Sequence, residues 1–265
     1  MASHHVLILG GHGNIAQKLT PLLLRRSWTV TSVIRKQEQV PTIEKLGAGL
    51  PGTLHVLVQS IEDVASQQQA QDILNKVKPD YIAWSAGAGG KGGPEATYKV
   101  DRDAAISFIH AAAATPSVRR FLLVSYNGSR RAAAPWWSSA EEWESYNTKV
   151  NYGILATYFQ AKIAADEALY AATKKPGATL TGICLRPGTL SDDAAGNVVL
   201  GKIPHVQGKV PRESVARVAD ALLAADGVKS GWIDLLEGDE SIKAAVDKAV
   251  KEGVDTAEGE AIYKQ

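Results

Sequence analysis

The segment VLILGGHGNIA, residues 6–16, places three glycines between a short apolar run and the start of a helical pattern. Gly10, Gly11 and Gly13 fit two overlapping forms of a glycine-rich turn in which Ala16 takes the third position. Without side chains the backbone can turn tightly and approach a pyrophosphate, whose charge is favoured by the N-terminus of the following helix. The segment therefore predicts a strand, a phosphate-binding turn and a helix in succession.

The residues around this turn support a ligand there. The apolar run at 6–9 predicts a buried strand, and Asn14 to Arg26 carry apolar residues at helical spacing. We therefore expect His12, Asn14 and Ile15 to lie beside a bound dinucleotide together with the three glycines. The alternative is an ordinary strand, turn and helix with no ligand.

Apolar runs alternate with helical patterns along the whole chain, which is typical of a parallel sheet built from βαβ units. The expected strands are Val6–Leu9, Thr29–Ile34, Leu54–Val58, Tyr81–Trp84, Phe121–Ser125, Leu180–Leu185 and Trp232–Leu236. The expected helices include Glu95–Ala114, Asn151–Thr173, Arg212–Ala225 and Ile242–Val250. We predict an α/β fold with a doubly wound (Rossmann) parallel sheet. Residues 1–265 should form a single domain, with the cofactor half at about 1–150 and the substrate side at about 130–147 and 186–265.

Composition and charge limit the classes of partner. The 265 residues are 45% hydrophobic and 22% charged, as expected of a globular chain, and 29 Lys and Arg against 28 Asp and Glu leave a formal net charge of +1. This balance predicts no nucleic-acid partner and no membrane surface. Neither a signal segment nor a membrane span is expected, so we predict a cytoplasmic protein. Cys184, the single cysteine, excludes an internal disulfide, and the histidines lack metal-ligand spacing, so no metal is predicted.

Two cations, Arg35 and Lys36, follow the second expected strand, where a protein selective for NAD usually carries an acid. A guanidinium and an ammonium suit the 2′-phosphate of NADP(H), so NADP(H) is favoured over NAD(H). The alternative is a solvated basic loop, and Glu38 nearby weakens the assignment. Ser60 and the run Ser85, Ala86, Gly87 come directly after other strands, so they are expected at the same carboxyl edge of the sheet.

Tyr158 and Lys162 lie four residues apart in YFQAK and hence on one face of the expected helix. A nearby ammonium favours the ionised form of a phenol, whose ordinary pKa is about 10, so the lysine can tune the tyrosine for proton transfer. Tyr170 and Lys174 repeat the spacing, but they lie at the far end of the helix, beside its Lys-Pro-Gly stop. The alternative for Tyr158 and Lys162 is an ordinary amphipathic helix.

At this point the chain resembles the short-chain dehydrogenase/reductase superfamily over nearly its whole length. The segments NGS, YFQAKIAADEAL, LRPGTLSDDAAG and WSAGAGGKGG are similar to the atypical, NmrA-like branch, which includes fungal oxidoreductases. The resemblance implies that Tyr158 exchanges the substrate proton and that Lys162 also holds the nicotinamide ribose. It implies that Ser125 polarises a substrate carbonyl, the alternative being a hydroxyl that only caps the strand, and that Pro187 and Gly188 approach the nicotinamide.

The sequence departs from the family pattern in two ways. Ala16 replaces the third glycine, which the branch tolerates, and the third strand ends in Val58, Gln59 and Ser60, without the acid that commonly contacts adenine. No acidic contact to the adenine is therefore expected at the end of the third strand.

The stretch RRAAAPWWSSAEEWESYN between Ser125 and Tyr158 holds Trp136, Trp137 and Trp143, half of the six tryptophans. These aromatic side chains could cover the nicotinamide as a lid over a flat apolar substrate, or they could simply pack on the helix. We expect an NADPH-dependent oxidoreductase that reduces a carbonyl or quinone-like aromatic small molecule, with a place in fungal secondary metabolism implied by the resemblance. The alternative is a non-catalytic NADP(H)-sensing regulator that acts through a protein partner. The oligomeric state stays open, with a monomer weakly favoured.

Overall fold

The computed structural model describes residues 3–90 and 92–264 of the chain. The described strands are β1 (His5–Leu9), β2 (Thr29–Ile34), β3 (Thr53–Val58), β4 (Tyr81–Trp84), β5 (Arg120–Val124), β6 (Thr181–Pro187), β7 (Thr189–Ser191), β8 (Val198–Leu200), β9 (Lys209–Pro211) and β10 (Gly231–Glu237). Eight of them form one sheet in the order β3-β2-β1-β4-β5-β6-β10-β8, parallel throughout except for the pairing of β8 with β10. The predicted doubly wound α/β fold is thereby confirmed.

Helices connect and cover these strands. The α-helices are α1 (Asn14–Arg25), α2 (Val40–Glu44), α3 (Gln67–Val77), α4 (Gly93–Thr97), α5 (Ala105–Ala113), α6 (Ala140–Tyr146), α7 (Ala156–Thr173), α8 (Arg212–Ala224) and α9 (Ile242–Glu252). Short 3₁₀ turns span Gln37–Gln39, Lys45–Gly47, Ile61–Asp63 and Ala261–Lys264, and π-helical segments span Tyr98–Ala104 and Asn147–Ile154. No helix of the described residues is both long and apolar enough to cross a membrane.

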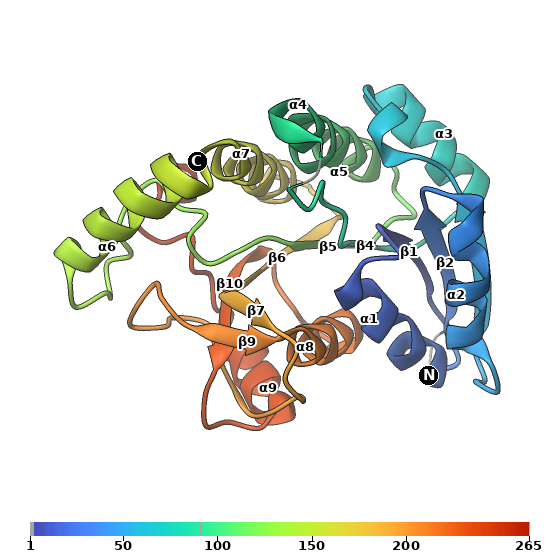
Figure 1. Cartoon of the computed structure of the whole chain (residues 1–265). Coiled ribbons are helices and arrows are strands. Elements are labelled where there is room, and N and C mark those ends of the chain that lie inside the picture. The colour runs from blue at the N-terminus through green and yellow to red at the C-terminus, as the bar shows by residue number, and fades with distance from the viewer. Residues whose placement is uncertain (1–2, 91, 265) are drawn as a thin grey trace.

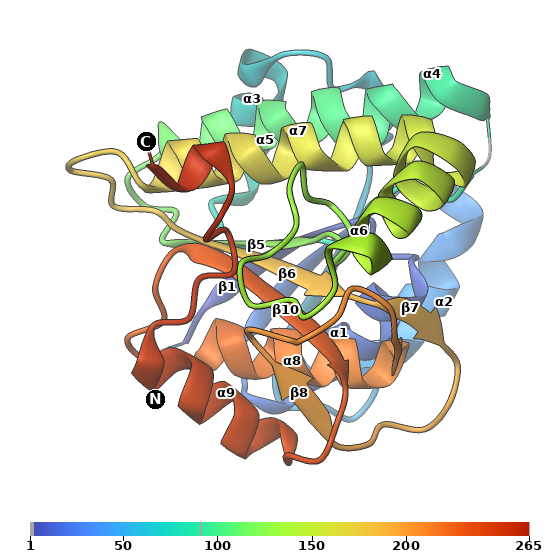
Figure 2. The same ribbon diagram turned by 90° about the vertical axis from the view of Figure 1, so that its left-hand side faces the viewer.

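The helices form two layers with the sheet between them. Figures 1 and 2 show α3, α5 and α7 packed over one face, and α1, α8 and α9 over the other. Side chains alternate along a strand, so β1 serves both cores: Leu7 and Leu9 join the core beneath α5 and α7, whereas Val6 and Ile8 join the core beneath α1 and α8. Apolar residues on both faces explain why the central strands appear in the sequence as continuous apolar runs.

The expected helices over Glu95–Ala114 and Asn151–Thr173 each contain a π-helical segment in the structure, so neither is a regular α-helix throughout. In the second, the Leu155 amide donates to the Val150 carbonyl, five residues back, and the buried Asn151 side chain donates to the Gly128 carbonyl. Hydrophobic spacing follows a 3.6-residue period and gives no signal for such a bond. The two-stranded sheet of β7 and β9 was also not predicted, because its strands are only three residues long.

A buried cation joins β6 to the C-terminal half of the chain. Arg186 is fully buried, and its Nε donates to Asp234 on β10 at 2.7 Å. Its two terminal nitrogens donate to the carbonyl oxygens of Ser129 and Asn127 at 2.7 and 2.8 Å. Asp166 on α7 lies 3.6 Å from the same guanidinium. One side chain thus satisfies groups from three separate parts of the chain.

Replacing this arginine should cost much of the stability of the fold. Arg186→Met leaves two buried carboxylates without their cation, so we expect the free energy of unfolding to fall by about 3–5 kcal/mol in urea denaturation. Arg217→Met is the matched control, because Arg217 makes an exposed pair with Glu213 one turn away and should change stability by less than about 1 kcal/mol. Equal losses in the two variants would contradict this account.

Candidate functional site

A cavity of about 430 Å³ opens at the carboxyl edge of the sheet, between the ends of β1 and β4. The strand order reverses at this point, because the chain runs outward from β1 through β2 to β3 and then returns to β4. Such a switch point is where doubly wound folds bind their ligands. The predicted residues that line the cavity are Gly10, His12, Gly13, Asn14, Arg35, Ser85, Ala86 and Gly87.

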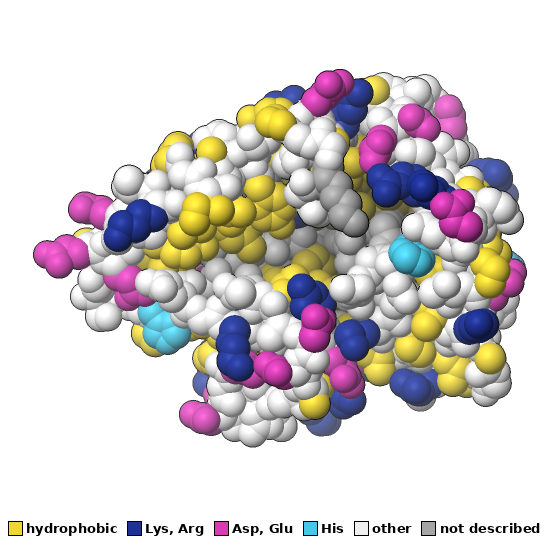
Figure 3. Space-filling view, viewed as in Figure 1, with side chains coloured by type: hydrophobic (Ala, Val, Ile, Leu, Met, Phe, Trp, Pro, Cys, Tyr) yellow, Lys and Arg dark blue, Asp and Glu magenta, His cyan; other side chains and the backbone are white. Residues whose placement is uncertain are grey.

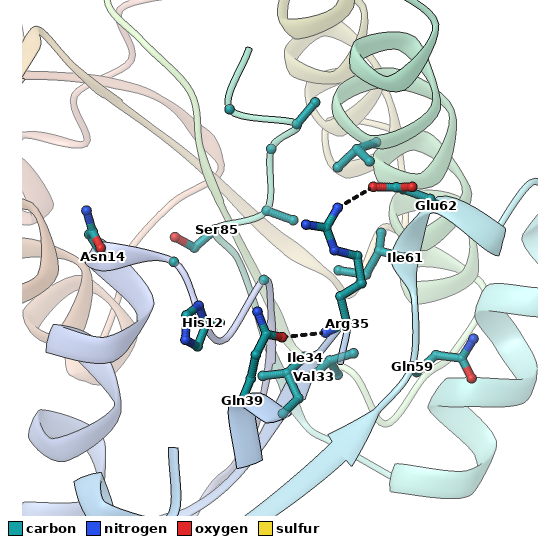
Figure 4. A pocket seen from close by; sticks show the side chains of 17 residues that line it. His12, Asn14, Val33, Ile34, Arg35, Gln39, Gln59, Ile61, Glu62 and Ser85 are labelled. Atoms are coloured by element: carbon teal, nitrogen blue, oxygen red, sulfur yellow. Dashed lines mark hydrogen bonds and ion pairs between the residues drawn. The ribbon is translucent and has the colours of Figure 1, made fainter. Parts of the chain in front are cut away.

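The glycine turn contributes Gly10 and Gly13 to the lining of this cavity, whereas Gly11 is not among the lining residues. His12 of the same turn and Asn14 at the start of α1 lie beside them (Figure 4). Gly10 has a φ of +85°, and a Cβ there would lie 2.6 Å from the Cα of Ala86. A Cβ on Gly11 would lie 1.8 Å from Ser32 Oγ, and one on Gly13 would lie 3.1 Å from the Gly10 carbonyl oxygen. Side chains are therefore excluded at Gly10 and Gly11 and crowded at Gly13, which keeps the turn compact beside the cavity.

Helix α1 begins directly after this turn, with Gly13 as its N-cap residue. No described side chain caps this end of the helix, and its first turn carries no acidic residue. The free amide groups and the helix dipole therefore leave a positive end beside the cavity. A phosphate group is the ligand that such an end binds well.

Other predicted cofactor residues lie outside the cavity lining. Ile15 is buried in the core beneath α1, and Lys36 pairs with Glu38 through a 3.3 Å contact. Ser60 precedes a 3₁₀ turn, and Pro187 ends β6. Gly188 packs against β10, since a Cβ there would lie 2.2 Å from a methyl carbon of Leu236. The described cavity thus contains the phosphate end of the predicted site, and the roles of these residues stay predictions.

Several lining residues were not predicted. They are Val33, Ile34, Gln39, Gln59, Ile61, Glu62, Ala88, Gly89 and Val100. Gln39 accepts hydrogen bonds from the backbone amides of Arg35 and Lys36 at 3.2 and 3.1 Å, and Glu62 accepts from the Arg35 guanidinium at 2.7 Å (Figure 4). The sequence could have indicated some of these residues by their place in the chain. Gln59 to Glu62 follow β3 directly, and residues that follow parallel strands lie at the carboxyl edge of the sheet.

The structure places Tyr158 and Lys162 one turn apart on α7, with Asp166 one turn further on. Lys162 is 1% exposed, its Nζ donates to the Val124 carbonyl at 2.8 Å, and that nitrogen lies 6.0 Å from the centre of the Tyr158 ring. The ring of Tyr126 lies 5.3 Å from that of Tyr158. The predicted pair is therefore brought together, but neither residue lines the described cavity.

Burial and charge act in opposite directions on this pair. Burial raises the pKa of Tyr158 above its ordinary 10, and the lowering effect of Lys162 does not offset it. Burial lowers the pKa of Lys162, but Tyr158, Asp101 and Asp166 together raise it above its ordinary 10.5. At neutral pH the phenol therefore holds its proton and the lysine its charge, which is the state required of a proton donor.

Ser125 follows β5 and is buried. Its Oγ donates to Asp166 Oδ2 at 2.7 Å. Because a serine hydroxyl has one hydrogen, Ser125 in this arrangement cannot also donate to a substrate oxygen. Asp166 was not predicted, although its place four residues after Lys162 put it on the same helix face. Ser125 as a donor to substrate stays a prediction that requires rotation of this hydroxyl.

A second buried carboxylate links the cavity to α7. Asp101 is 1% exposed and accepts a hydrogen bond from the Ala88 amide at 2.9 Å, which holds the loop after β4 in place. Burial raises the pKa of Asp101, while the charge of Lys162 lowers it. Asp101 thus lies between a loop that lines the cavity and the lysine of the predicted catalytic pair.

The tryptophans between β5 and α7 are held by other segments of the chain. The indole nitrogens of Trp136 and Trp137 both donate to the Ile203 carbonyl, at 2.8 and 2.9 Å. Trp143 is buried, and its ring stacks with that of Tyr146 at 6.3 Å. Hydrophobic side chains gather on the molecular face below α7, beside the central hollow (Figure 3). Packing accounts for the contacts of these tryptophans, and a lid role stays untested.

Known proteins similar to this chain include binders of nicotinamide dinucleotides, in agreement with the glycine turn at the cavity. A family model described as NAD(P)H-binding matches residues 10–226. A UPF0659 protein of Schizosaccharomyces pombe is 30% identical to this chain, and the match covers 93% of this chain and 95% of that protein. An uncharacterised sugar epimerase of Bacillus subtilis, YhfK, is also 30% identical, and the match covers 92% of this chain and 99% of that protein. The crystal structure of the oxidoreductase ylbE from Lactococcus lactis has the same fold, with a TM-score of 0.69 and 21% sequence identity. That match covers 93% of this chain and 97% of the ylbE chain. The chain therefore belongs to the NAD(P)H-binding family of Rossmann-fold proteins.

Proposed function

We propose that this protein is an NADPH-dependent oxidoreductase of the atypical short-chain type, which reduces a carbonyl or quinone-like group of an apolar, aromatic small molecule. The observation that carries the proposal is the placement of Tyr158 beside the buried Lys162, whose Nζ reaches the Val124 carbonyl at the carboxyl end of β5, the edge of the sheet that also holds the glycine turn. This combination joins a phosphate-binding turn to a proton donor in one fold.

The residues present fit a nicotinamide dinucleotide. Gly10 to Asn14 and the free end of α1 would hold the pyrophosphate, and Arg35 would face the 2′ position of the adenosine ribose. The bound reduced nicotinamide supplies a hydride. Tyr158 Oη would give its proton to the substrate oxygen, and the Lys162 charge would stabilise the phenolate left behind. The hydrophobic surface below α7 favours an apolar substrate (Figure 3).

A sugar epimerase is the second candidate, favoured by the 30% identity to YhfK. The same tyrosine and lysine would then act in a reversible transfer of hydride, and no nicotinamide would be consumed. Net oxidation of NADPH with a carbonyl or quinone substrate supports the reductase, whereas interconversion of sugars at constant cofactor absorbance supports the epimerase. A sensor that only binds the cofactor would show neither. A place in fungal secondary metabolism stays a prediction.

Blocking the glycine turn should weaken cofactor binding. In Gly13→Val the new side chain meets the Gly10 carbonyl and enters the cavity, so we expect NAD(P)H affinity to fall at least about tenfold in a fluorescence titration. Gly196→Val is the control, because a Cβ there meets nothing within 4 Å and should leave binding unchanged. Undiminished binding by folded Gly13→Val protein would place the cofactor elsewhere.

The preference for NADPH should depend on Arg35. Arg35→Ala removes the guanidinium that lines the cavity, and we expect NADPH affinity to fall about fivefold to tenfold, with NADH affinity nearly unchanged. Lys36→Ala is the comparison, because its ammonium pairs with Glu38 outside the lining and should contribute less. Calorimetric titration of both variants with both cofactors tests this, and an equal loss for NADH and NADPH in Arg35→Ala would oppose it.

Catalysis should depend on the phenol of Tyr158. Tyr158→Phe keeps the ring but removes the proton donor, so kcat for reduction should fall at least about 100-fold while NADPH affinity changes less than about twofold. Tyr152→Phe is the matched control, since Tyr152 is 57% exposed. Full turnover by Tyr158→Phe would refute the assignment.

The rate of reduction by the wild-type protein should not decline between pH 7 and 9 in a pH–rate profile. The raised pKa of Tyr158 keeps the phenol protonated over this range.

A further inference from the structure

An ion pair lies within the cavity. Among the described lining residues, the Lys, Arg, Asp and Glu side chains are Arg35 and Glu62 alone. Arg35 Nη1 donates to Glu62 Oε1 at 2.7 Å, and the two side chains point toward each other (Figure 4). The side chains are 56% and 38% exposed, so each is still open to solvent or a ligand. The cation expected to face a 2′-phosphate is thus already paired with a carboxylate.

The fold itself brings these two residues together, although 27 positions separate them in the sequence. Strands β2 and β3 pair in parallel, with Ile34 opposite Val58 at their carboxyl ends. Arg35 follows directly after β2, and the 3₁₀ turn Ile61–Asp63 carries Glu62 back toward it. The nearby acid Glu38 pairs with Lys36 instead and does not line the cavity.

The pair has opposite effects on the two cofactors. A 2′-phosphate must compete with the Glu62 carboxylate for Arg35, and the two negative groups repel each other. The 2′-hydroxyl of NADH carries no charge, and a carboxylate near a ribose is a favourable hydrogen-bond acceptor. An isolated arginine at this position would favour NADPH more strongly than an arginine held by a carboxylate.

We propose that Glu62 is a specificity-determining residue that weakens the preference for NADPH, so that the cavity also accepts NADH. The proposal rests on the proposed cofactor function of this cavity and adds a second determinant to Arg35. It follows that removal of the carboxylate charge should free Arg35 for the 2′-phosphate.

The test is calorimetric titration of wild-type protein, Glu62→Gln and Glu38→Gln with NADPH and NADH, and with adenosine 2′,5′-bisphosphate as a probe of the 2′-phosphate alone. In Glu62→Gln the ratio of the NADH to the NADPH dissociation constant should rise about three- to fivefold, the size expected for a solvent-exposed pair. The bisphosphate should bind more tightly by a similar factor. Glu38→Gln removes the same charge from an exposed pair outside the lining, so its ratio should stay within about twofold of the wild type.

The outcomes separate the two claims. If wild-type protein binds both cofactors and the ratio does not move in Glu62→Gln, this inference is wrong and the proposed function stands. If the ratio moves equally in both variants, general surface charge sets it and the inference is again wrong. If wild-type protein binds neither cofactor, the proposed function fails first and the inference fails with it.

Discussion

The close approach of the glycine turn after β1 to the loop after β4 is the constraint on which the site depends. At Gly10 the space for a side chain is already taken by Ala86, and the Ala86 carbonyl is itself held by the indole nitrogen of the buried Trp84 at 3.1 Å. The two loops therefore meet across the switch point of the sheet, and the cavity lies above their junction. A bulkier turn would separate the loops and remove the close backbone surface that a pyrophosphate needs.

Buried charges connect this cavity to the rest of the molecule. Asp101 holds the loop after β4, and the charge of Lys162 lowers the pKa of this carboxyl. Asp166 accepts a hydrogen bond from Ser125 and lies 3.6 Å from the Arg186 guanidinium. Arg186 in turn donates to Asp234 on β10. Each charge in this series has an opposite charge or a hydrogen-bond partner nearby, as burial requires. The series explains why the helix that carries Tyr158 is tied both to the cavity and to the C-terminal strand. The cavity and the Tyr158–Lys162 pair are thus linked by one series of buried side chains.

The sequence predicts those features that depend on residues close together in the chain. The spacing of apolar residues predicts the strand before Gly10 and the helix after it. The three glycines predict a tight turn between them, and the structure shows that side chains would be crowded there. Residues that depend on tertiary pairing could not be found in this way: Glu62 reaches Arg35 only because β2 and β3 lie side by side, and Asp166 meets Ser125 across the helix-to-sheet contact. The π-helical segment before Tyr158 was also missed, since a bond across five residues leaves no mark on apolar spacing.

In the proposed complex, one NADP(H) molecule lies along the carboxyl edge of the sheet, between the glycine turn and Tyr158. A crystal structure of the protein with NADP⁺ tests it most directly. We expect the pyrophosphate over Gly10 to Asn14, the 2′-phosphate at Arg35 and the nicotinamide ring directed toward Tyr158. A dinucleotide bound at another surface, or one whose nicotinamide points away from α7, would contradict it.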